Sequence, residues 1–140
     1  MKLWVVLAPT HILNLYSGYS MYEEIDPLGY KSNFRQFLKK QSGIYGWTVD
    51  HHIFPKCLKN HPVLRNMNIN CGQNLKIMPD KNANTHPSIL KHTSHLRYNR
   101  YVKHHLDKIY FQIDKENRQY QLYLLLHHLE QKLNFGELPF

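Results

Sequence analysis

The chain has 140 residues, which is enough for one modest hydrophobic core, and no change of composition divides it into two halves. We therefore expect a single domain over residues 1–140. Lys and Arg number 18 against 10 Asp and Glu, a formal net charge of +8, which favours a phosphate-rich partner over an acidic protein surface. The apolar run at residues 3–8 is too short for a signal peptide or a membrane span, so we expect an intracellular protein without membrane contact.

The first expected helix follows Ser32, a residue type that commonly caps helix N-termini. Phe34, Phe37 and Leu38 recur at helical spacing and are expected to pack, and Gly43 suits the C-terminal stop.

Two short strands are expected next. The segment from Trp47 to Phe54 is rich in aromatic and branched residues and stops at Pro55, so we expect a strand with His51 and His52 at its end. A second strand is expected over residues 75–78, with Pro79 stopping it. The loop between them is marked by Asn68, Asn70 and Gly72. Cys57 and Cys71, without a Cys-x-x-Cys unit, are expected to be ordinary reduced thiols.

Two helices complete the predicted elements, which makes the fold class α+β. The first spans about residues 94–113 and the second about 115–133. One face of the first is apolar through Tyr98, Val102, Leu106, Ile109 and Ile113. The residues expected to pack from the second are Tyr120, Tyr123, Leu124, Leu126 and Leu129. The helical spacing of Tyr98, Tyr101, Tyr110 and Tyr123 also predicts core positions for these tyrosines.

The residues that carry chemistry occur in a definite order along the chain. An adjacent pair, His51 and His52, precedes Asn74, and His92 and His95 stand ahead of the long helix. One imidazole of a pair can hold a divalent cation while its neighbour deprotonates water, and histidines at a following helix can close the metal site. This order is typical of a metal-dependent nuclease.

Three blocks of sequence carry a family resemblance: His51-His52-Ile53-Phe54-Pro55, Asn74 to Pro79, and His92 to Val102. Together they resemble the HNH/endonuclease VII superfamily, and most closely its AHH branch, over roughly residues 47–106. The resemblance implies a ββα-metal (His-Me) finger at about residues 47–113, embedded among flanking helices.

The resemblance also implies a role for each matched residue. His51 would be a metal ligand and His52 the general base that activates water. Asn74 would brace the loop by hydrogen bonds to the backbone near the base. His92 and His95 would complete the set of metal ligands. The site would hold one divalent ion, Mg²⁺ or Mn²⁺, with Zn²⁺ as the alternative.

Four further residues are candidates for supporting roles. Asp50 stands where the AHH branch usually has alanine, and we interpret it as a carboxylate that orients an imidazole, with direct metal ligation as the alternative. His86 competes for a ligand position from the loop before the long helix. Lys91 and Arg97 are candidates for binding phosphate, with solvated surface charges as the alternative. The helix pairs His104-His105 and His127-His128 are expected to pack or face water.

These observations favour an endonuclease that hydrolyses phosphodiester bonds, with DNA preferred to RNA as its partner. A second hypothesis is a non-catalytic nucleic-acid-binding module in which the histidines hold a structural metal ion. A third is a helical partner-binding protein, which the apolar residues from Leu122 to Leu133 support but which leaves the central motif unexplained.

Overall fold

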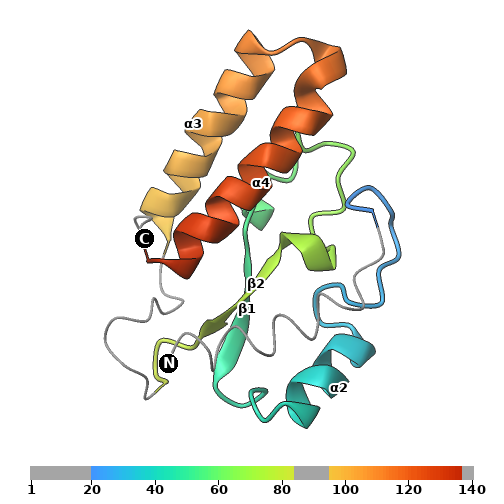
Figure 1. Ribbon diagram of the computed structural model, residues 1–140, viewed down its shortest axis with the longest axis vertical. Coiled ribbons are helices and arrows are strands. Elements are labelled where there is room, and N and C mark those ends of the chain that lie inside the picture. Colours follow the sequence, from blue (N-terminus) through green and yellow to red (C-terminus); the bar gives the residue numbers. More distant parts are fainter. Residues whose placement is uncertain (1–19, 84–94, 137–140) are drawn as a thin grey trace.

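The computed structural model describes residues 20–83 and 95–136 (Figure 1). Its main elements, in chain order, are α2 (Asn33–Gln41), β1 (Thr48–His52), β2 (Leu75–Pro79), α3 (Leu96–Gln112) and α4 (Arg118–Asn134). Short 3₁₀ turns occur at Lys56–Leu58, Gly72–Asn74 and Lys115–Asn117. The expected α+β class is confirmed by this mixture of helices with a two-stranded sheet.

Helix α2 begins and ends as its sequence predicts, but it buries a different face. The Ser32 side chain accepts a hydrogen bond from the Arg35 backbone N–H at the N-cap. At the other end Gly43 adopts a positive φ of 73° and its N–H bonds back to the Lys40 carbonyl, as in a Schellman motif. The expectation that Phe34 and Phe37 pack inward is wrong, because both side chains are exposed.

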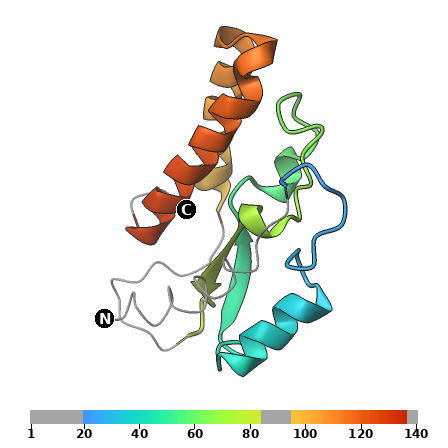
Figure 2. The ribbon, with the colours of Figure 1, turned by 45° about the vertical axis from the view of Figure 1, so that its right-hand side comes forward.

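Strands β1 and β2 pair antiparallel, with His51 opposite Lys76 and Asp50 opposite Ile77. Successive side chains of a strand point to opposite faces of a sheet, so His51 and Asp50 diverge. In Figure 2 the helices α3 and α4 stand above one end of the strands, and α2 lies at the opposite end. His51 is directed towards α3, and Asp50 is directed towards α2.

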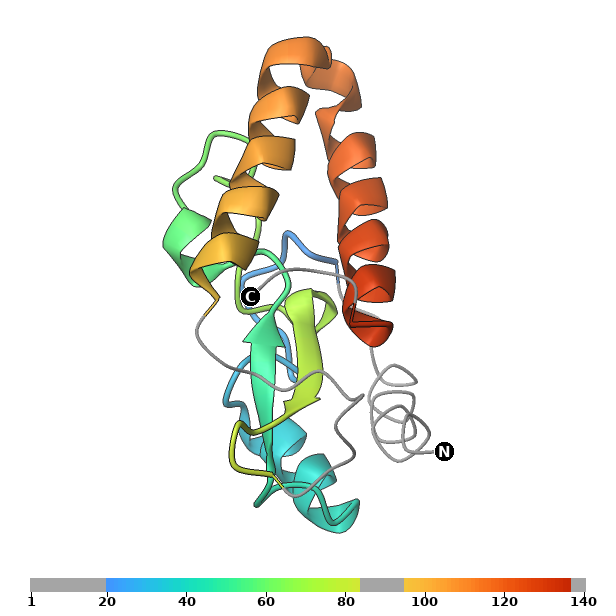
Figure 3. The ribbon, with the colours of Figure 1, turned by 90° about the vertical axis from the view of Figure 1, so that its left-hand side faces the viewer.

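Helices α3 and α4 form an antiparallel pair above the sheet (Figure 3). The predicted apolar face of α3 is confirmed, since Tyr98, Val102, Leu106 and Ile109 are all buried. The prediction for α4 is partly wrong. Its buried residues are Leu122, Leu125, Leu126, Leu129 and Leu133, while Tyr120, Tyr123 and Leu124 are exposed. Tyr110 of α3 is also exposed, contrary to its expected place in the core.

The main core lies between this helical pair and the long connection from β1 to β2, which contributes Ile53, Phe54, Leu64, Met67, Ile69 and Cys71. The connection is also tied to α3 by a polar contact, because Asp107 accepts from His61 Nε2 at 2.8 Å and from Lys103 Nζ at 2.9 Å. Neither Cys57 nor Cys71 forms a disulfide. Within the described ranges, none of the helices has the length and apolar character needed to cross a membrane.

Candidate active site at the end of strand β1

A cavity of about 230 Å³ lies where β1 ends and α3 begins. Its walls come from Tyr30, Asp50, His51, His52, Pro55, Lys56, Cys57, His95 and Asn99. The fold therefore brings three of the histidines selected from the sequence, His51, His52 and His95, to one cavity. Because the cavity extends around the end of the strand, both members of the adjacent pair line it although they point to opposite faces.

His51 occupies the α3 side of this cavity, and only 1% of its surface is exposed. Its ring centre lies 5.5 Å from that of His95 and 4.9 Å from that of Tyr98, both in edge-to-face arrangements. His95 stands at the N-cap of α3, and its Nδ1 lies 3.0 Å from Oδ1 of Asn99 in the first turn of the helix. The first turn of α3 thus places one imidazole and one amide oxygen beside His51.

His52 lies on the other side of the strand end, in contact with a different set of groups. Its Nε2 lies 2.9 Å from Oδ1 of Asn70, and its ring meets the Tyr30 ring edge-on with 4.6 Å between the centres. Because an amide oxygen only accepts hydrogen bonds, Nε2 carries the proton and Nδ1 of the neutral ring keeps a lone pair. Burial lowers the pKa of His52 from the usual value, so the ring is neutral at pH 7.

Asn74 holds the chain that follows the histidine pair. It is fully buried, its Oδ1 accepts from the Phe54 N–H at 2.7 Å, and its Nδ2 donates to the carbonyls of Phe54 at 3.0 Å and Ile69 at 2.8 Å. Its own carbonyl accepts from the Ile53 N–H at 2.8 Å. Phe54 comes two residues after His52 and Ile69 immediately precedes Asn70. The Asn74 amide therefore joins the backbone beside His52 to the backbone beside Asn70, the hydrogen-bond partner of His52.

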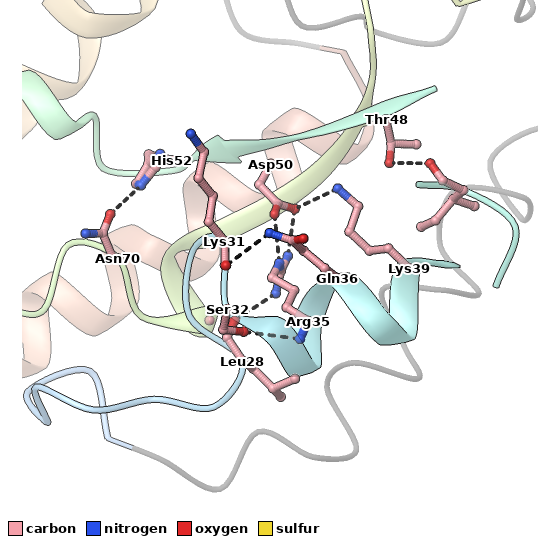
Figure 4. Close-up of polar contacts among 12 residues, drawn as sticks. Leu28, Lys31, Ser32, Arg35, Gln36, Lys39, Thr48, Asp50, His52 and Asn70 are labelled. Carbon is pink, nitrogen blue, oxygen red and sulfur yellow. Dashed lines mark hydrogen bonds and ion pairs between the residues drawn. The ribbon is translucent and has the colours of Figure 1, made fainter. Parts of the chain in front are cut away.

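Asp50 has partners other than the imidazole that we expected. Arg35 donates to both of its oxygens, Nε to Oδ2 and Nη2 to Oδ1, each at 2.9 Å, and Lys39 Nζ lies 3.7 Å from Oδ1 (Figure 4). All three side chains are almost wholly buried. The reason is geometric, since strand alternation turns Asp50 away from His51 and towards α2. Asp50 thus joins β1 to α2 through these ion pairs, while its expected imidazole-orienting role and the alternative of metal ligation stay predictions.

Three side chains that line the cavity, His51, His95 and Asn99, carry donor atoms of the kinds that divalent ions bind. With metal–nitrogen bonds of about 2.1 Å, two imidazoles on one ion have ring centres about 5 Å apart, close to the separation of His51 and His95. The Asn99 amide adds an oxygen of the kind that Mg²⁺ and Mn²⁺ accept. Among residues 20–83 and 95–136, no group of three or more His, Cys, Asp or Glu is placed to hold a metal ion. The described residues therefore show no complete metal site, and the ligand set stays a prediction.

Several expected site residues contribute nothing to the described geometry. His86, Lys91 and His92 lie outside the residues that the structure describes. Arg97 is exposed on α3 and is not among the cavity walls.

The sequence interpretation missed three residues around His52. Asn70 carries the contact to Nε2 of His52 but was expected only to mark a loop. Tyr30 and Lys31 lie in the segment before α2, where no sustained periodicity gave a signal. Their proximity to His52 depends on the hydrogen bond from the Tyr30 N–H to the Asn70 carbonyl, 2.9 Å, which joins segments 40 residues apart in the chain. Only the folded arrangement reveals such a contact.

Comparison of the chain with protein-family models, with curated proteins and with solved structures finds no significant match.

Proposed function

We propose that this protein is a metal-dependent endonuclease of the HNH type and that β1, β2 and the start of α3 form its ββα-metal finger. The observation that carries the proposal is the shared cavity, in which His51 and His95 face one another while His52 stands at the strand end with its Nδ1 lone pair available. A general base beside a group of metal-ligating side chains is what hydrolysis of a phosphodiester needs.

His51 and His95 would hold the divalent ion, with Asn99 or the expected ligand His92 completing its coordination. When bound, the ion would supply positive charge against a non-bridging oxygen and the departing oxygen of the phosphate. The two described imidazoles come from different elements, β1 and α3. Packing of Tyr98 and Val102 in the core fixes the start of α3 relative to the strand.

His52 would act on the attacking water. Its Nδ1 takes the water proton while the water oxygen forms the new bond to phosphorus, and the bond from phosphorus to the 3′ oxygen breaks. The leaving oxygen takes a proton from solvent, so the products carry 5′-phosphate and 3′-hydroxyl ends. Asn70 positions the base, because its bond to Nε2 fixes both the tautomer and the ring plane. Asn74 keeps the backbone on either side in register.

We propose DNA as the preferred substrate, on the resemblance to the HNH superfamily. The formal charge of +8 suits the phosphate backbone of either nucleic acid, and attack by water would also allow cleavage of RNA. The second candidate is a non-catalytic nucleic-acid-binding module with a structural metal ion. It is the weaker proposal because it gives no use to a neutral, oriented His52 beside the other two histidines.

The test is cleavage of supercoiled plasmid and of single-stranded RNA by the purified protein, with Mg²⁺, Mn²⁺ or Zn²⁺ and with EDTA. We expect metal-dependent cutting of plasmid that His52→Ala abolishes. His104→Ala, which removes an exposed histidine of α3, is the matched control and is expected to cut like the wild type. Nucleic-acid binding without cutting under all three metals would refute the nuclease and favour the structural-metal module.

A further inference from the structure

Two lysines lie at the edge of the cavity on the side of the general base. Lys56 Nζ lies 5.2 Å from the centre of the Tyr30 ring, and Lys31 Nζ lies 5.3 Å from it. The same ring contacts His52, with 4.6 Å between the ring centres. One aromatic side chain therefore gathers two ammonium groups beside the proposed base, through cation–π attraction.

The backbone of Lys31 supports a use for its side chain. Lys31 has a φ of 60°, the one positive value among the non-glycine residues that the structure describes. A left-handed conformation is unfavourable for any residue with a Cβ atom, and glycine adopts it without that penalty. Residues held in such conformations concentrate at functional sites. Lysine at this position thus keeps an ammonium group where the backbone alone would favour glycine.

The segment that carries Lys31 is fixed on both sides. The Tyr30 N–H donates to the Asn70 carbonyl, and the Lys31 carbonyl accepts from Gln36 Nε2 of α2 at 3.0 Å. In Figure 4 the Lys31 side chain extends from this segment towards the end of β1 that carries His52. Lys56, in contrast, follows Pro55 just after the end of β1 and lines the cavity itself. The two charges therefore reach one region from separate, ordered segments.

We propose that Lys31 and Lys56, held by Tyr30, form a phosphate-binding rim that contacts the nucleic-acid backbone next to the bond that is cut. This inference rests on the proposed function and deepens it. The Tyr30 ring serves as the platform for the two ammonium groups, so the rim recognises phosphate charge and carries no base specificity. The phosphate-binding role expected of Lys91 and Arg97 stays a separate prediction.

Binding without metal tests the rim separately from catalysis. The affinity of a fluorescent 20-nucleotide DNA, single-stranded and duplex, is measured by anisotropy in EDTA over a range of salt concentrations. Loss of one phosphate contact reduces the slope of log affinity against log salt by about 0.9 for duplex and about 0.7 for single strands, which is a five- to tenfold loss of affinity near 0.1 M salt. We expect this change for Lys31→Gly and again for Lys56→Gln.

Two controls keep the test specific. Lys40 is exposed near the end of α2 and outside the cavity walls, and its Nζ lies 4.8 Å from the centre of the Tyr45 ring. Lys40→Gln therefore removes an equivalent charge and should leave the slope nearly unchanged. Lys31→Gly should unfold at or above the wild-type temperature, because it relieves the positive φ. Weak binding by this variant then reflects the lost ammonium group and not a damaged fold.

The outcomes separate the rim from the nuclease. If the wild type cuts DNA but both rim variants bind like Lys40→Gln, the rim is refuted and the nuclease stands. If both variants lose affinity and slope but the wild type does not cut DNA with any of the three metals, the rim stands and the nuclease fails. Because the rim recognises phosphate charge, excess inorganic phosphate is expected to compete with DNA for the wild type at constant ionic strength. Competition that is equally strong for both rim variants would overturn the rim.

Discussion

Replacing Asn74 by alanine should destabilise the protein more than any other loss of a single amide that the described contacts suggest. The side chain is fully buried and satisfies three backbone groups, the Phe54 N–H, the Phe54 carbonyl and the Ile69 carbonyl. Each buried group left without a partner costs about 1–3 kcal/mol. Because such costs are not additive, we expect a total loss of about 3–6 kcal/mol, against a total stability of about 5–15 kcal/mol for a typical domain.

Urea unfolding followed by circular dichroism measures this loss. With a slope of about 2 kcal/mol per M, the midpoint of Asn74→Ala should fall by about 2 M. Asn66→Ala, at an exposed position, is the control and should change stability by less than about 0.5 kcal/mol. Asn74→Asp keeps an acceptor for the Phe54 N–H but turns an oxygen towards two carbonyls, so it should not restore stability. A loss below about 1 kcal/mol in Asn74→Ala would refute the bracing role.

Three further predictions concern other contacts of the described residues. Asp50→Ala leaves Arg35 as an uncompensated buried cation and should lower the free energy of unfolding in urea by about 3–5 kcal/mol. The double variant with Arg35→Ala should lose much less than the sum of the two single losses, and additive losses would contradict the pairing. Hydrogen bonds lower the pKa of Asp107, so its stabilising effect is present above about pH 4 and is lost as the pH falls through its folded-state pKa. The stability difference between the wild type and Asp107→Asn should therefore shrink between pH 6 and pH 3, and a constant difference would argue against the contact. A thiol reagent should label Cys57 alone in the native protein and both cysteines in denaturant, because burial raises the pKa of Cys71 to about 11; rapid native labelling of Cys71 would count against its burial.

The local elements were predictable because their signals are local. Ser32 and Gly43 mark the two ends of α2 through interactions with residues of the same helix, and Pro55 follows shortly after the end of β1. The apolar stripe of α3 repeats at the helical period, so its buried face follows directly from the sequence. In each of these cases the deciding interactions lie within a few residues.

Helix α4 shows where periodicity stops being informative. Leucine occupies four of the five positions from Leu122 to Leu126 and tyrosine the fifth, so apolar residues surround much of the helix and several faces suit burial. In the folded protein, packing against α3 and the loops buries Leu122, Leu125 and Leu129 and leaves Leu124 exposed. The choice depends on the partner surface, which a single-helix pattern does not contain.

The same distinction between local and distant interactions applies to the residues of the candidate site. The order of His51, His52 and Asn74 identified the residues that the fold brings near the end of β1, since their spacing reflects a short strand pair. The ion-pair partner of Asp50 could not be predicted, because Arg35 lies 15 residues earlier on a separate helix and a carboxylate has several candidate cations in this chain. Asn70 was equally hidden, because asparagine in a loop is most often a turn residue.

The central claim, that one histidine holds a metal ion while its neighbour activates water, is tested most directly by comparing His51→Ala with His52→Ala for both Mn²⁺ binding and plasmid cleavage. Binding is measured by calorimetry on the folded proteins, with His104→Ala as the reference. The proposed site predicts that His51→Ala loses both metal affinity and cutting, whereas His52→Ala binds Mn²⁺ with the reference affinity and does not cut. Cutting by His52→Ala at the reference rate, or equal metal affinity in the His51→Ala protein, would contradict it.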